Sequence, residues 1–83
     1  MSLADASVQY RVVLGKKDER IEGPDGADVV VTAPFDVVTA DGFDATVEYM
    51  RGRVKASGHT GVLLELLKSG AATSRLSRLA SRP

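Results

Sequence analysis

The hydrophobic pattern of the first 33 residues predicts three strands. From Ser7 to Leu14, apolar side chains occupy every second position, which is typical of a strand with one face on a core. Lys17–Glu22 is polar except for Ile21, and this composition suits a strand at the edge of a sheet. A Gly-Pro-Asp-Gly turn at 23–26 follows. Asp28–Ala33 is apolar on both faces, which indicates a central strand.

The next 36 residues predict helices and one more strand. Pro34 suits the first turn of a short helix whose β-branched residues give it little intrinsic stability, so this helix is either a mobile lid or a connector. Asp44 can cap a second helix and Gly52 can end it. We therefore expect helices at Pro34–Ala40, Asp44–Arg51 and His59–Ser69, and a fourth strand at Arg53–Ser57.

These elements define an α+β domain over residues 1–70. Its sheet is expected to be mainly antiparallel, with about four strands and two to three helices packed on one face, in the order β-β-β-α-α-β-α. After Leu67 the composition changes, and residues 71–83 are expected to form a flexible basic tail. Two alternatives for this tail are weak contact with an anionic membrane and contact with an acidic partner, both through Arg75, Arg78 and Arg82.

The composition excludes several kinds of chemistry. The chain has no cysteine and a single histidine, so disulfides, cysteine-ligated metals and a histidine-based triad are excluded within one copy. His59 is then either a pH-sensitive residue at a helix start or an exposed turn residue. The formal net charge of zero argues against nucleic acid as a partner. No apolar run approaches the length of a membrane span, so we expect a cytoplasmic protein that has no enzymatic activity and no cofactor.

Three adjacent segments resemble the C-terminal half of the sterol carrier protein type-2 family. Their order and spacing match that family in Tyr49-Met50-Arg51-Gly52-Arg53-Val54-Lys55, Gly58-His59-Thr60-Gly61 and Val62-Leu63-Leu64-Glu65-Leu66-Leu67. Residues 27–32 look like the family's preceding strand, so the resemblance covers roughly Val8 to Leu67. Two residues depart from the family pattern: Ala45 stands where a proline is usual, and His59 where an acidic or amide residue is common.

The resemblance implies noncatalytic binding or transfer of a fatty acyl chain, a sterol or a similar lipid in a hydrophobic cavity between the sheet and the helices. The residues that would line this cavity are Phe35, Val38, Phe43, Tyr49, Met50, Val54, Val62, Leu63, Leu66 and Leu67. Compared with the family, the chain is expected to lack an N-terminal helix and a first strand. We therefore expect a homodimer in which a second copy covers the exposed surface. The alternative is a small homodimerisation or accessory domain, in which the same ten residues pack as core and bind no ligand.

Overall fold

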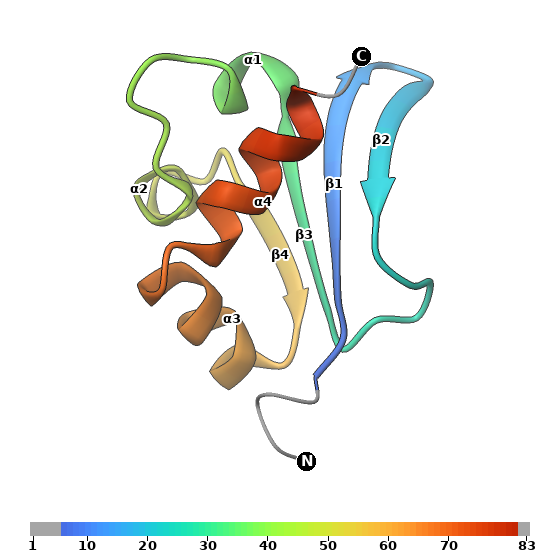
Figure 1. Ribbon diagram of the computed structural model, residues 1–83, viewed down its shortest axis with the longest axis vertical. Helices are drawn as coiled ribbons and strands as arrows, with labels where there is room; N and C mark the ends of the chain where they lie inside the picture. Colours follow the sequence, from blue (N-terminus) through green and yellow to red (C-terminus); the bar gives the residue numbers. More distant parts are fainter. Residues whose placement is uncertain (1–5, 82–83) are drawn as a thin grey trace.

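The structure is a computed structural model that describes residues 6–81 (Figure 1). Its strands are β1 (Val8–Gly15), β2 (Asp18–Glu22), β3 (Val29–Pro34) and β4 (Lys55–Gly58). Its helices are α1 (Phe35–Val38), α2 (Ala45–Met50), α3 (Thr60–Lys68) and α4 (Ala71–Ala80). The helices gather on one side of the sheet in Figure 1, and α4 crosses in front of β1 and β3. The expected α+β class is confirmed, with one more helix than the sequence predicted.

The sheet is mixed, with strand order β2-β1-β3-β4. The pairs β1–β2 and β3–β4 are antiparallel, and β1–β3 is parallel. The parallel pair follows from the hairpin: β2 ends beside the start of β1, and the chain then crosses to the other side of β1, so β3 must run in the same direction as β1 (Figure 1). The expectations that the second strand lies at an edge and the third is central are both confirmed.

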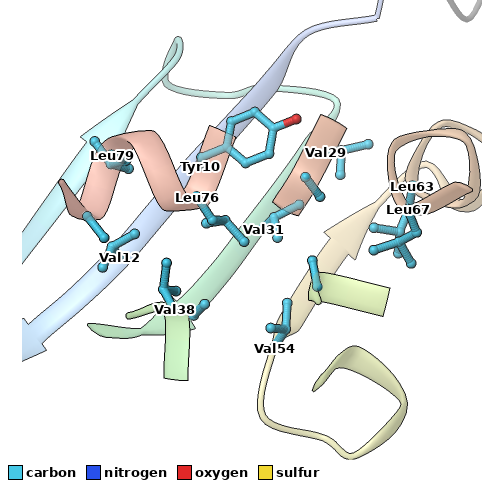
Figure 2. Close-up of a cluster of buried hydrophobic side chains, with 14 of the residues drawn as sticks. Tyr10, Val12, Val29, Val31, Val38, Val54, Leu63, Leu67, Leu76 and Leu79 are labelled. Atoms are coloured by element: carbon cyan, nitrogen blue, oxygen red, sulfur yellow. The ribbon is translucent and has the colours of Figure 1, made fainter. Parts of the chain in front are cut away.

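The alternation of side chains along each strand shows on which face of the sheet each residue lies. Tyr10 and Val12 of β1 and Val29 and Val31 of β3 are buried on the face that the helices cover (Figure 2). The residues between them project to the opposite face because successive side chains of a strand alternate. No described helix lies over that opposite face, which we call the open face.

Helix α4 overturns the prediction of a flexible tail over residues 71–81. Ala72, Leu76, Leu79 and Ala80 are buried, and their spacing of i, i+4, i+7 and i+8 forms one helical stripe. The two leucines alone would make a thin stripe. The alanines complete it because small side chains let the helix approach the sheet closely. Arg82, the third arginine assigned to the tail, lies outside the described residues.

Polar contacts fix the C-terminal end of α4. The Arg20 guanidinium on β2 donates hydrogen bonds to the carbonyl oxygens of Leu79 and Ala80, at 3.1 and 2.7 Å. These carbonyls belong to the last turn, where no residue of the helix stands four positions further on to donate to them and where partial negative charge gathers, so a cation stabilises this end. Arg75 forms an ion pair with Glu22 at 3.7 Å, which adds a second link between α4 and β2.

Several boundaries differ from the predicted ones. Pro34 ends β3 instead of opening a helix, and α1 is a single turn that ends at Val38. The fourth strand begins at Lys55 rather than Arg53. The predicted end of the second helix at Gly52 is confirmed, since α2 ends just before it and Gly52 has a positive φ angle; Gly58, at the end of β4, also has a positive φ angle. At Gly58 a Cβ atom would collide with the carbonyl oxygen of Asp28, so this position requires glycine for space as well as for conformation.

Candidate functional site

Eight of the ten residues predicted to line a cavity meet in one apolar cluster, which contains the core residues of β1 and β3 and is partly shown in Figure 2. Five are buried: Val38, Val54, Val62, Leu63 and Leu67. Three pack against the cluster and are partly buried: Phe35, Phe43 and Leu66. The other two, Tyr49 and Met50, are exposed at the end of α2, where 82 % of Met50 is accessible to solvent.

Side-chain and backbone hydrogen bonds hold the helices around this cluster. The Asp44 carboxylate accepts a hydrogen bond from the Thr46 amide at 2.9 Å, which confirms the predicted cap of α2. The Thr46 hydroxyl donates to the Leu67 carbonyl oxygen at 3.1 Å and so joins α2 to the end of α3. Thr73 on α4 accepts from the Ala45 amide at 2.9 Å. Helices α2, α3 and α4 are therefore joined by specific polar contacts as well as by apolar packing.

His59 has a structural role at the start of α3. Its Nδ1 atom accepts a hydrogen bond from the Val62 amide at 3.3 Å, and its backbone amide donates to the Asp28 carbonyl oxygen at 3.0 Å. The first of these contacts satisfies one of the free amides of the helix N-terminus. His59 thus lies at a helix start, as in the first predicted alternative, and is exposed, as in the second.

The space between the sheet and the helices is occupied by side chains of α4. Leu76 and Leu79 are fully buried there, next to Val12 and Val31 in Figure 2. We describe five surface hollows, and none of them is lined by more than two of the ten predicted residues. In this structure the predicted cavity residues are therefore core residues or surface residues.

The most apolar of the five hollows lies on the open face, and we call it the Pro34 hollow. Its volume is about 510 Å³. It is lined by Val13, Thr32, Pro34, Asp36, Val37, Gly52, Arg53 and Lys55. The strand register explains how its members come together, because Val13 lies opposite Pro34 and Thr32 lies opposite Lys55. Both pairs project away from the helical core.

Three charged side chains line the Pro34 hollow. The ammonium group of Lys55 lies about 4.0 Å from the place where Gly52 would carry a Cβ atom, close to the turn before β4. Arg53 forms an ion pair from Nε to Glu48 Oε2 at 3.6 Å. Asp36 is the acidic side chain among the described residues that line the hollow. The lining thus carries two positive groups and one negative group.

A second hollow, of about 310 Å³, adjoins the Pro34 hollow and shares Asp36, Val37 and Arg53 with it. This second hollow is polar, and Glu48 lies within it. Glu48 Oε1 pairs with Arg51 at 3.3 Å, and Glu48 Oε2 is buried without a hydrogen bond but within ion-pair distance of Arg53. Arg53 therefore connects an apolar hollow to a charged one.

The apolar residues of the Pro34 hollow lie outside the predicted site. Val13, Pro34 and Val37 were absent from that site because it was expected between the sheet and the helices. One signal was present: Val13 follows Gln9 and Arg11 on the face of β1 that the alternation assigns to solvent. An apolar residue at such a position marks a surface that is only partly solvated.

Tyr10 is the described group whose pKa departs clearly from its ordinary value. Burial against the helical layer raises the pKa of the Tyr10 hydroxyl, while the nearby Arg75 guanidinium lowers it and Glu22 raises it. The net direction is upward, so the fold favours the neutral phenol. In residues 6–81, no group of three or more carboxylate and imidazole side chains is placed to hold a metal ion. Within the same residues, no helix is long and apolar enough to cross a membrane.

Comparison with known proteins gives no match: no family model, no curated protein and no solved structure matches the chain. The resemblance to the sterol carrier protein type-2 family stays a prediction, based on the segments between Tyr49 and Leu67.

Proposed function

We propose that the protein is a noncatalytic domain that binds a small apolar ligand in the Pro34 hollow. The observation that carries this proposal is the hollow itself, which combines a volume of about 510 Å³ with a floor made by Val13, Pro34 and Val37. Small-molecule sites typically have volumes of roughly 300–1,000 Å³ and an apolar lining with a few polar groups at defined positions. Each of the three floor residues is only partly buried, so a ligand would remove further apolar surface from water.

The proposed site is the Pro34 hollow and not the predicted cavity between the sheet and the helices, for an energetic reason. A ligand between the sheet and the helices would have to displace Leu76 and Leu79 of α4. Exposing two buried leucines costs roughly 3–6 kcal/mol, at about 1.5–3 kcal/mol for each side chain. That cost would weaken binding by about two to four powers of ten, at about 1.4 kcal/mol for each tenfold change. The Pro34 hollow needs no such displacement because it is already open.

The first test is native mass spectrometry of the purified chain, followed by organic extraction and analysis of any bound lipid. Titration with N-phenyl-1-naphthylamine, a neutral apolar dye whose fluorescence rises on binding, then measures affinity directly. Val37→Asp places a charge in the floor of the hollow and should weaken dye binding at least tenfold.

Leu64→Asp is the matched control for this substitution. Leu64 is on α3, is 52 % exposed, and lines none of the five hollows. The same change of charge and polarity is thus made at an exposed apolar residue elsewhere. Absence of dye binding to the unmodified chain, or equal binding by the Val37→Asp and Leu64→Asp variants, would contradict the proposal.

A second candidate function is that of an accessory domain that forms homodimers. The observation in its favour is the open face, where Ile21 is 42 % exposed and Val30 is only partly buried. Both edge strands are charged, with Asp18, Glu19 and Glu22 on β2 and Lys55 on β4, and such edges discourage pairing between strands of two copies. A second copy would therefore dock on the face and bury about 800 Å² on each partner if the interface is of standard size.

Sedimentation velocity at micromolar concentration separates the two candidates. A dimer that dissociates when Ile21 is replaced by glutamate, and that gives no dye signal, would support the accessory role. A monomer that binds the dye would support the ligand-binding role and contradict the homodimer.

A further inference from the structure

We infer that the Pro34 hollow selects amphiphiles with a single negative charge, of the type of an acyl or aryl monocarboxylate. This inference rests on the proposed function, since it names the class of ligand for the same hollow. The inference rests on the charged side chains of the lining, which are two cations and one carboxylate, and on the absence of an ion pair at Lys55 among the described residues.

Lys55 supplies a cation that no neighbouring carboxylate neutralises. Among residues 6–81, no carboxylate oxygen lies within 4 Å of its ammonium group. In the structure the ammonium group lies close to Gly52 at the turn before β4. An unpaired cation at the rim of an apolar hollow favours a ligand that brings a negative charge to that rim.

Arg53 provides a second positive group in the lining. Its Nε atom faces Glu48, while no hydrogen bond from its terminal nitrogens to another described residue is recorded. Guanidinium groups present several N–H donors in a planar fork that fits a carboxylate. The Glu48 carboxylate then orients Arg53 without occupying all of its donors.

The sheet register places Lys55 next to the apolar floor. Lys55 lies opposite Thr32, and Val13 lies opposite Pro34, which is two residues further along β3 than Thr32. Two residues along a strand span about 7 Å. A ligand whose apolar body covers Val13 and Pro34 therefore brings a directly attached headgroup to the Lys55 side. A carboxylate at the end of an alkyl or aryl body has this form.

The balance of charge limits the headgroup to one negative charge. The described lining holds Arg53 and Lys55 against Asp36, and Glu48, which pairs with Arg53, is also paired with Arg51; these three cations and two carboxylates leave one net positive charge. A monocarboxylate neutralises that charge. A dianionic headgroup such as a phosphomonoester would keep a surplus negative charge near the Asp36 carboxylate, and a cationic headgroup would face Lys55.

The experiment compares three ligands with the same ten-carbon chain: decanoate, decan-1-ol and decylammonium. Each is used to displace N-phenyl-1-naphthylamine from the unmodified chain at low ionic strength. We expect decanoate to bind several-fold more tightly than decanol, and decylammonium to bind most weakly. Exposed charge pairs typically contribute a factor of about 1.4–5 in affinity each. Lys55→Gln should therefore weaken decanoate binding about two- to fivefold and leave decanol binding unchanged.

Lys68→Gln is the control, because Lys68 is an exposed lysine on α3 that does not line the Pro34 hollow. It removes the same charge from the protein and should leave the preference for decanoate intact. Equal binding of decanoate and decanol, or equal losses in the Lys55→Gln and Lys68→Gln variants, would overturn the inference about ligand class while the proposed function stands. Failure of all three ligands and of the dye to bind would instead refute the proposed function.

Discussion

Replacing Leu76 with alanine tests whether α4 is part of the core. Leu76 is 0 % exposed and lies between the sheet and the other helices. The substitution removes three carbon atoms from a buried site, which costs about 2.4 kcal/mol in transfer free energy at about 0.8 kcal/mol per methylene group. The cavity left behind adds to this cost, and buried leucine-to-alanine changes typically cost about 2–5 kcal/mol. We therefore expect the free energy of unfolding to fall by about 3 kcal/mol.

This loss is large for so small a domain. At about 0.05–0.15 kcal/mol per residue, a chain of 83 residues has a total stability of roughly 4–12 kcal/mol. For domains of this size, 1 kcal/mol shifts the melting temperature by about 4–8 °C, so Leu76→Ala should lower it by more than 10 °C. Urea unfolding followed by far-ultraviolet circular dichroism measures the change, and the milder Leu76→Val variant serves if the alanine variant does not fold.

Leu64→Ala is the control for Leu76→Ala, because it makes the same chemical change at a residue that is 52 % exposed. It should cost clearly less than the buried substitution. If Leu76→Ala changed the free energy of unfolding by less than 0.5 kcal/mol, α4 would not be packed as described, and the flexible tail predicted from the sequence would be restored.

Two further predictions concern pH and backbone conformation. Because the pKa of Tyr10 is raised by burial, folding is favoured while the phenol is neutral, and stability should fall as pH rises above about 10. Urea unfolding at pH 8 to 11 should show a smaller alkaline loss for Tyr10→Phe, and identical pH profiles would contradict the raised pKa. Gly58→Ala should destabilise the protein far more than Gly70→Ala in thermal unfolding, since both residues have positive φ angles but only at Gly58 would a Cβ atom meet the Asp28 backbone. Similar melting temperatures for the two variants would refute this steric account.

Short-range patterns in the sequence were sufficient to predict most of the strands and helices. Alternation located β1, the polar composition of β2 placed it at an edge, and Asp44 marked the start of α2 through a hydrogen bond that the structure shows. These features depend on neighbours within a few residues, and short-range patterns report such neighbours directly. The end of α1 was missed because a single helical turn depends on tertiary contacts rather than on its own sequence.

The role of α4 was harder to predict because it depends on residues distant in the chain. Ser77 and Arg78 stand between Leu76 and Leu79. A segment with these polar residues resembles a solvated segment when it is considered alone. The carbonyls at its end are satisfied by Arg20, some 60 residues earlier in the sequence. The Pro34 hollow was missed for a similar reason, since Val13, Pro34 and Lys55 come from three strands whose register no local pattern specifies.

The small size of the domain explains why a ligand site would lie outside the core. A domain of about this length buries only roughly 60 % of its unfolded surface, so it needs most of its large apolar side chains for its own stability. In this chain α4 adds two leucines to the covered face, and no described hollow is lined by more than two of the predicted cavity residues. The core does not need the apolar side chains of the open face, because water already contacts that face. Val13, Pro34 and Val37 can therefore serve a ligand at little cost to folding, and an aspartate at position 37 should impair binding more than it impairs stability.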